Sequence, residues 1–386
     1  EDEDTKRIID MARKVEGCAR HISVHAAGVI ISPVPLDTLV PVQYDPKGEG
    51  KLITQYDMHA IDEDNVGLLK FDFLGIRNLA ILADAVKRVK KIYDVDIDIE
   101  HIPLDDPKTF SMLARGETEG LFQLNGDGMT KFLVELKPTT IHDINAMVAL
   151  YRPGPIEMIP EYIARKHDPS KVRYLDPRMK SILERSHGVI TYQDDVMLIA
   201  IELGGFSWVE ADKLRKAMGK KIPELMEEQK SKLNEGLIAH GMTVQKAEEL
   251  WKLIEPFAAY GFNKAHAASY GRVAYQTAYM KANYPTAYMA SILSAESGNL
   301  ETISEIMAEC KRMHIDVLPP DVNESLADFS VVTKEMSGDN TERIRFGLYS
   351  IKNFGEGIAD SIIAERKENG PFVSLEDFLS RIKDKN

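Results

Sequence analysis

Hydrophobic and polar positions follow two different periods along the chain, and the change of period divides it. Residues 5–19 place apolar side chains at helical spacing and predict an amphipathic helix. Residues 24–31 are rich in β-branched and small residues and predict a buried strand. Residues 51–58 and 67–74 predict two further extended segments, and prolines between the segments mark loops. The pattern therefore predicts a small mixed β region at the start of the chain.

Beyond residue 77 the helical period dominates as far as about residue 300. Ser207 and Glu210 have the spacing of a capping box at the start of one of the predicted helices. Helices are expected over residues 78–92, 107–114, 141–150, 179–185, 194–203, 207–218, 222–239, 244–258, 267–283 and 285–294. This stretch therefore predicts a large helical domain.

The remaining chain mixes both periods. A helix is expected at 301–313, and strands are expected at 328–333 and 343–348. Residues 350–382 predict short helices around a tight turn, with a capped helix from Ser374. The predicted fold class is α+β: a small mixed β piece, a large mostly helical domain and a C-terminal helix-hairpin-helix.

Composition is typical of a soluble globular protein. The chain has 386 residues, of which 44% are hydrophobic and 28% are charged. Its apolar runs are far shorter than the roughly 20 residues of a membrane span. The two cysteines, Cys18 and Cys310, have no metal or redox spacing, so a reducing cytoplasm is expected. The chain starts at Glu1 rather than at Met, and we expect it to be a piece of a longer protein.

The net charge of −13 argues against a generally basic nucleic-acid binder, so any binding or catalytic site must be sought in local clusters of side chains. The first candidate cluster lies in the segment LKFD over 69–72. On a strand, Lys70 and Asp72 share one face, and Phe71 and Phe73 pack on the other. A carboxylate that faces a cleft is a hard oxygen ligand suited to Mg²⁺. The alternative is a solvated face with one surface ion pair.

Two further clusters are cationic. Arg152 lies in a stiff turn, YRPGP over 151–155, where a guanidinium loses little entropy on binding phosphate. The segment KLRKAMGKK over 213–221 has five basic residues and no acidic one. Helical spacing puts its cations along one face, where they could hold a triphosphate or a DNA backbone. They are Lys213, Arg215, Lys216, Lys220 and Lys221. An ordinary turn and a solvated helix face are the alternatives.

Residues 256–295 contain no acidic residue, although 61 of the 386 residues of the chain are acidic. The window contains Lys264, His266, Arg272 and Lys281, and six tyrosines beginning with Tyr260. Cations interleaved with aromatic rings suit a phosphate groove with rings for base stacking. A buried pair of helices would lack acids as well, so core packing is the alternative.

Residues 351–359 place a tight turn between helical stretches, in the pattern of a helix-hairpin-helix. Lys352, Gly355 and Gly357 lie in this turn. Exposed backbone N–H groups at a helix N-terminus favour a DNA phosphate. A purely structural turn is the alternative.

Together these segments occur in a familiar order, and the chain resembles the catalytic alpha subunit of bacterial DNA polymerase III, the family C replicative polymerase. The resemblance covers essentially all 386 residues. It is carried by HAAGVII (25–31), LKFDFLG (69–75), LFQL (121–124), ALYRPGP (149–155), YQDDVM (192–197), RKAMGKK (215–221), YGFNKAH (260–266), YQT (275–277) and LPPD (318–321).

The resemblance implies a layout. Residues 1–20 correspond to the end of the thumb, 21–76 to the second part of the palm, 77–330 to the fingers, and 331–386 to the start of the helix-hairpin-helix region. It also implies a DNA-directed DNA polymerase that adds deoxynucleotides to a primer on a DNA template. The sliding clamp and other replisome subunits are expected to bind regions absent from this chain.

The resemblance assigns roles to individual residues. Asp72 matches the third of three palm aspartates that hold two Mg²⁺ ions for in-line phosphoryl transfer. The residues expected on the nucleotide side are Lys70, Arg152, Arg215, Lys220, Lys221, Lys264 and His266. Those expected to contact DNA are Lys213, Lys216, Arg272, Tyr260, Lys352, Gly355 and Gly357.

Two departures from the family pattern bear on activity. The paired aspartates of the neighbouring palm strand do not precede Asp72 on any predicted buried strand, so this piece alone is expected not to polymerise DNA. Asn353 stands where the hairpin usually has its first glycine, and Asn tolerates the left-handed conformation that the turn needs. A non-catalytic DNA-binding module remains the alternative function.

Overall fold

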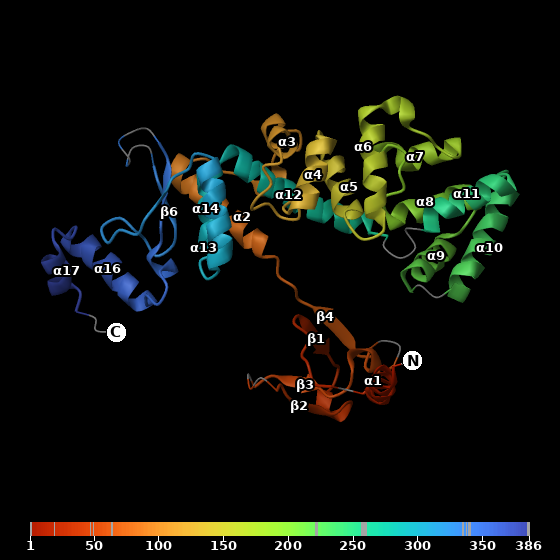
Figure 1. Cartoon of the computed structure of the whole chain (residues 1–386), viewed down its shortest axis with the longest axis horizontal. Coiled ribbons are helices and arrows are strands. Elements are labelled where there is room, and N and C mark those ends of the chain that lie inside the picture. Colours follow the sequence, from red (N-terminus) through yellow and green to blue (C-terminus); the bar gives the residue numbers. More distant parts are fainter. Residues whose placement is uncertain are drawn as a thin grey trace. The chain divides into compact units, whose positions relative to one another are not determined.

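The structure is a computed structural model. It describes residues 2–18, 20–46, 48, 50–62, 65–220, 223–255, 261–333, 336, 338 and 341–383, with the backbone alone at residues 220 and 223. The chain folds as two compact units, Glu1–Ile76 and Arg77–Asn386 (Figure 1). The architecture is α+β, as predicted, with sheets of two or three strands and a largely helical second unit.

The first unit contains one helix and two antiparallel strand pairs. Helix α1 (Glu3–Val15) is followed by β1 (Gly28–Ile31), β2 (Val42–Tyr44), β3 (Leu52–Thr54) and β4 (Leu69–Asp72). Strand β1 pairs with β4, and β2 pairs with β3. Val40, Ile61 and Leu68 form a small core in this unit, against which Ile30 and Leu36 pack.

The strands of the first unit are shorter and more exposed than predicted. In the β1–β4 pair, Val29 lies opposite Phe71 and Ile31 lies opposite Leu69. All four side chains are exposed, so the prediction of a buried strand at 24–31 is wrong. Phe73 is 70% exposed and its ring stacks on that of Phe71 instead of packing into a core. Only alternate residues of a two-stranded ribbon can face the small core of this unit.

Fifteen helical segments predominate in the described part of the second unit, and most coincide with predictions. They are α2 (Arg77–Tyr93), α3 (Pro107–Ala114), α4 (Asp127–Leu136), α5 (Ile141–Leu150), α6 (Ile159–His167), α7 (Lys180–Leu183), α8 (Gln193–Gly204), α9 (Trp208–Lys220), α10 (Pro223–Ala239), α11 (Val244–Ile254), α12 (Lys264–Asn283), α13 (Pro285–Ala295), α14 (Leu300–Arg312), α16 (Glu356–Asn369) and α17 (Leu375–Arg381). The predicted capping box at Ser207 and Glu210 is formed. Helices α4 and α6 were not predicted.

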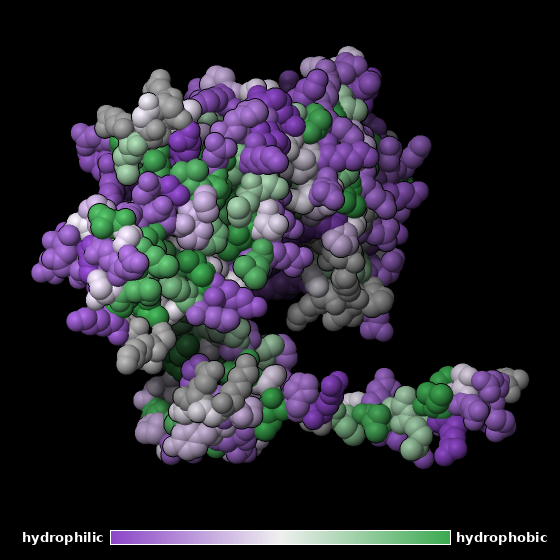
Figure 2. Space-filling model, turned by 60° about the vertical axis from the view of Figure 1, so that its left-hand side comes forward, coloured by the Kyte–Doolittle hydropathy of each residue, from purple (hydrophilic) through white to green (hydrophobic). Residues whose placement is uncertain are grey.

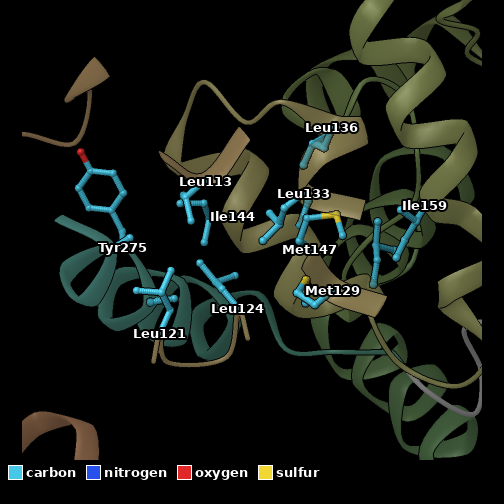
Figure 3. Close-up of a cluster of buried hydrophobic side chains, with 14 of the residues drawn as sticks. Leu113, Leu121, Leu124, Met129, Leu133, Leu136, Ile144, Met147, Ile159 and Tyr275 are labelled. Atoms are coloured by element: carbon cyan, nitrogen blue, oxygen red, sulfur yellow. The ribbon is translucent and has the colours of Figure 1, made fainter. Parts of the chain in front are cut away.

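Helix α12 runs through the middle of the second unit, against α3 and α5 (Figure 1). Figure 3 shows part of the core, in which apolar side chains from α3, α4, α5, α6 and α12 gather. Gly271 lets α12 approach α5 closely, because a Cβ atom at this position would lie 1.9 Å from Asn145 Oδ1. The approach lets the two helices pack closely where Gly271 faces Asn145.

The end of the chain forms a three-stranded sheet and a small helical cluster. Strands β5 (Val317–Leu318), β7 (Arg343–Arg345) and β6 (Ser330–Val332) lie in that order. Leu348, Ala359, Ile362 and Phe372 form a separate core under α16 and α17. In the described residues no helix is both long enough and apolar enough to cross a membrane. Hydrophilic residues cover most of the face in Figure 2, with apolar patches among them.

Candidate nucleotide and nucleic-acid sites

Asp72 lies at the end of β4, directly opposite Gly28 of β1. Its Oδ1 atom is 3.1 Å from Lys70 Nζ and 3.6 Å from His25 Nδ1. The same His25 nitrogen accepts a hydrogen bond from the backbone N–H of Gly28 at 2.7 Å, which holds the ring beside the carboxylate. A Cβ atom at position 28 would lie 3.2 Å from Asp72 Oδ1 and 2.9 Å from His25 Nδ1, so glycine permits this approach.

His25 is the residue of this cluster that sequence reasoning missed. It stands three residues before β1, and only the register of β1 against β4 brings it to Asp72. His25 and Lys70 also line a groove of about 940 Å³ within the first unit, together with Gly28, Tyr56 and Phe73. The predicted pair of Lys70 and Asp72 is therefore formed, with both side chains partly exposed, and Lys70 lines the groove whereas Asp72 does not belong to its lining.

The fit of this cluster to magnesium is partial. Within the described ranges, no group of three or more His, Cys, Asp or Glu side chains is placed to hold a metal ion. Mg²⁺ is often bound by one or two carboxylates together with substrate phosphates, so Asp72 suits one oxygen ligand. A two-ion site requires further ligands. The described residues thus do not fit a complete two-magnesium site, and we derive no chemical step through metal ions.

In the second unit, Arg152 and His266 converge on one aromatic ring. The guanidinium carbon of Arg152 lies 3.8 Å from the centroid of the Phe262 ring. The His266 ring is 5.0 Å from Phe262 at 71°, in an edge arrangement. Arg152 follows α5, whereas Phe262 and His266 lie at the start of α12. Two side chains predicted from distant segments are therefore brought together.

Lys264 lies at the first turn of α12 and belongs to the same region. Its Nζ is 3.8 Å from Asp195 Oδ1 and 5.5 Å from the centroid of the Tyr192 ring. Its backbone N–H donates to Asp194 Oδ2 at 2.8 Å. Tyr192 and Phe262 are joined by a parallel bridge, so the rings under Lys264 and Arg152 belong to neighbouring segments. This arrangement presents cations on a preorganised support.

A buried carboxylate lies beneath Lys264. Asp195 accepts hydrogen bonds from the backbone N–H groups of Thr191 and Tyr192, both at 3.0 Å, and caps α8. Burial raises the pKa of Asp195 to about 6, against the opposing effects of these hydrogen bonds and of Lys264. The charge beneath Lys264 is therefore sensitive to pH in the acidic range.

The cations of α9 make contacts within their own helix. Arg215 donates to Asp212 Oδ1 at 2.8 and 2.9 Å, and Lys216 Nζ is 3.0 Å from Asp212 Oδ2. Lys213 is exposed. Asp212 thus neutralises part of the charge of this helix. The side chain of Lys220 and the whole of Lys221 lie outside the described residues.

The acid-free window of 256–295 divides into two parts. Arg272 donates to the carbonyl oxygen of Glu100, and Tyr275 and Tyr288 are fully buried in the core. Lys281 is buried as well. The core-packing interpretation therefore describes the later part of the window, and open cations are confined to its start. Tyr260 lies outside the described residues.

The predicted hairpin turn has the backbone that its sequence allows. Asn353 adopts φ 62°, the left-handed conformation expected of it. Gly355 is the N-cap of α16. A Cβ atom at Gly355 or Gly357 would meet no atom within 4 Å, and Lys352 is exposed. The start of α16 is therefore an open surface that a phosphate could approach.

Comparisons with known proteins identify the family to which the chain belongs. Residues 78–241 match a family model described as the finger domain of the bacterial DNA polymerase III alpha subunit. Residues 1–75 match the model of the alpha NTPase domain of that subunit, and 314–386 match a helix-hairpin-helix motif. Together they define the class of the chain: a polymerase-subunit region that combines fingers with a helix-hairpin-helix.

Individual relatives give the same result. The chain is 45% identical over 386 residues to the DNA polymerase III subunit alpha of Thermus aquaticus, covering 99% of this chain and 31% of that protein. Identity to the subunit of Aquifex aeolicus is 42% over 387 residues, covering 100% and 32%. For Mycobacterium leprae it is 41% over 387 residues, covering 99% and 32%. The chain belongs to the bacterial DNA polymerase III alpha subunit family, and it spans about a third of the length of these relatives.

Proposed function

We propose that the chain contributes the nucleotide-binding and DNA-binding surfaces of a DNA-directed DNA polymerase that extends a primer on a DNA template in the bacterial cytoplasm. The observation that carries the proposal is the convergence of Arg152 and His266 on Phe262, next to Lys264, within the finger-like unit. Guanidinium and ammonium groups on a fixed support suit the triphosphate of an incoming deoxynucleotide.

The proposal gives the other predicted residues supporting roles. Lys70, Arg215, Lys220 and Lys221 would add positive charge on the nucleotide side. The DNA backbone would be held by Lys213, Lys216, Arg272, Tyr260, Lys352, Gly355 and Gly357. The last two offer backbone N–H groups at the open start of α16, where the helix dipole favours a phosphate. Sliding-clamp and replisome contacts are proposed for regions of the family outside this chain.

Asp72 is the proposed carboxylate of the chemical step. The partly exposed carboxylate, paired with Lys70 of the groove lining, suits one ligand of a magnesium site, and Mg²⁺ held there together with further ligands would supply Lewis acidity for phosphoryl transfer. Lys70 donates to Oδ1 at 3.1 Å and holds it in place, and the His25 ring lies beside it with Nδ1 at 3.6 Å. Because the described residues offer no cluster of three ligands, we propose that the 386-residue chain does not extend a primer by itself.

Primer extension by the complete polypeptide encoded by the gene tests this function. Asp72→Asn should lower the extension rate by about 10²-fold or more, the scale of losing one electrostatic contact to the transition state. Its affinity for primer–template DNA should stay unchanged. Asp96→Asn, which alters an exposed carboxylate paired with Lys90, is the matched control. Full extension activity of Asp72→Asn would refute the assignment, and absence of any extension by the parent would favour a non-catalytic DNA-binding module.

A further inference from the structure

Phe262 has a position that the proposed function alone does not explain. It lies in the short segment before α12, and its carbonyl oxygen accepts a hydrogen bond from the N–H of Gln193 at 3.0 Å. Its ring is 9% exposed and packs with Tyr192, Val148 and Ala267 in a small core of its own. This core fixes the ring independently of any ligand.

One face of the fixed ring carries Arg152, at 3.8 Å from guanidinium carbon to ring centroid. The edge of the same ring meets His266, which lies 4.1 Å from Tyr270. With Arg152 over one face and His266 against it in an edge arrangement, the buried Phe262 ring is poorly suited to stacking on a free base. It is well suited to holding Arg152 in a single orientation.

The contact that orients Arg152 also determines whether its positive charge is compensated. Among the described residues, no carboxylate forms an ion pair with Arg152, whereas Arg215 and Lys216 are both paired with Asp212. An aromatic face attracts a guanidinium through its quadrupole and leaves the positive charge uncompensated. Arg152 is therefore held in place while its donors stay available to an anion.

A second arginine in the chain provides a contrast. Arg381 lies 4.3 Å above the Phe372 ring, in nearly the same arrangement. Arg381, however, is also paired with Glu365 at 2.9 Å and Asp377 at 3.1 Å. Its charge is compensated, and its stacking has a structural role. Of the two arginines that stack on a phenylalanine, the one whose charge is not compensated by a described carboxylate is Arg152, which lies in the same region as Lys264 and His266.

We propose that Phe262 is the positioning residue of the triphosphate site: it orients Arg152 as an uncompensated cation for the polyphosphate chain of an incoming nucleotide. The inference rests on the proposed function, since it deepens the same site. It assigns to Phe262 no contact with the nucleotide, only the orientation of Arg152.

Binding of dTTP and of inorganic tripolyphosphate to the 386-residue chain tests the proposal. Phe262→Leu, which removes the ring, should weaken binding of both probes about three- to tenfold, the range of one cation–π contact. Phe262→Tyr retains an aromatic face and should bind like the parent. Phe372→Leu is the matched control and should leave binding unchanged. In the complete polypeptide, Phe262→Leu should raise the KM for dTTP by the same factor and leave kcat unchanged.

A double-mutant cycle separates positioning from general damage. Arg152→Ala should weaken binding at least as much as Phe262→Leu, and the double variant should bind no more weakly than Arg152→Ala alone. Additive losses, or no loss with Phe262→Leu, would overturn the inference while leaving the site intact. If Arg152→Ala itself has no effect, the proposed nucleotide site fails as well. Phe262→Met, which keeps the side-chain volume, replaces Phe262→Leu should the latter lower the melting temperature.

Discussion

The two ends of helix α12 carry lysines with opposite surroundings. At the N-terminal end, Lys264 is 44% exposed and its Nζ lies 3.8 Å from the Asp195 carboxylate. Near the C-terminal end, Lys281 is fully buried. Its Nζ donates to Glu309 Oε1 at 2.6 Å and to the carbonyl oxygens of Glu119 at 2.7 Å and Glu117 at 3.0 Å. One helix therefore has a partly exposed cation at one end and locks the fold with a buried cation at the other.

The difference shows what an absence of acidic residues can mean. Lys281 needs no acidic neighbour within its own stretch, because two of its three acceptors are backbone carbonyl oxygens and the third comes from α14. Arg312 and Lys281 hold the pKa of Glu309 below its usual range despite burial. The acid-free composition thus arises from packing at one end and from an open cationic surface at the other.

The largest expected effect is at the buried end. Lys281→Ala leaves the Glu309 carboxylate without one of its partners and two carbonyl oxygens without a donor. It should lower the free energy of unfolding by about 3–5 kcal/mol, the cost of breaking a buried ion pair. Chemical denaturation followed by circular dichroism measures this change.

Lys264→Ala is the matched variant at the other end of the same helix. Because its ion pair is partly exposed, we expect a loss of at most about 1 kcal/mol. Equal losses for the two variants would show that the contrast between the ends has no energetic basis.

The second expected effect concerns the buried acid beneath the open end. Burial raises the pKa of Asp195 to about 6, above its ordinary value of 3.8. The folded state therefore binds more protons than the unfolded state between about pH 4 and 6, and the contribution of Asp195 to stability falls as pH rises through that window. At about 1.4 kcal/mol per pKa unit, the change is on the order of 2–3 kcal/mol.

Asp195→Asn should remove this dependence, because an amide oxygen can still accept from Thr191 and Tyr192 but does not titrate. The measurement is the difference in unfolding free energy between parent and variant at pH 4 and at pH 7. The difference should shift in favour of the variant at pH 7. A constant difference across the range would show that Asp195 titrates normally.

The third effect tests the close approach in the middle of α12. Gly271→Ala would place a Cβ atom 1.9 Å from Asn145 Oδ1, so α5 and α12 must move apart. We expect a destabilisation of about 1–3 kcal/mol from overpacking, although alanine is the better helix former. Chemical denaturation of Gly271→Ala measures it.

Asn145→Ala provides the rescue for this prediction. Asn145 Oδ1 is buried and has no hydrogen-bond partner among the described residues, so its removal frees space without breaking a bond to any of them at that atom. The cost of Gly271→Ala should shrink in the Asn145→Ala background. The backbone Cα of Asn145, 3.3 Å from the added atom, limits the recovery. An unchanged cost in both backgrounds would place the conflict elsewhere.

Helices could be predicted from the sequence where burial follows one face, as in α2 and α14. Helices α4 and α6 could not, because α4 begins at Asp127 between Gly126 and Gly128, and α6 contains Pro160. Their apolar residues Met129, Leu133 and Ile159 are fixed by packing into the common core (Figure 3), and tertiary contacts override weak local propensity. The strands of the first unit were predicted too long, since apolar composition does not show which residues find a partner strand.

In the candidate sites, too, single residues could be predicted from the sequence, whereas the contacts between them could not. Arg152, Lys264 and His266 could be singled out from composition and turn chemistry. The meeting of Arg152 and His266 at Phe262 depends on the packing of α5 against α12, which no local pattern shows. The burial of Lys281 depends on Glu309, 28 residues further along the chain. His25 reaches Asp72 only through the register of β1 and β4.

The smallest expected effect on stability, and the sharpest on binding, is at Lys264. Lys264→Ala should weaken the affinity for a DNA primer–template severalfold and reduce the slope of log K against log salt concentration by about one, since one phosphate contact is lost. Lys108→Ala, at the first turn of α3, changes the same net charge and should leave the slope unchanged. A salt slope that stays the same in Lys264→Ala would mean that the open end of α12 is a solvated surface like any other, because a cation that displaces no counterion contacts no phosphate.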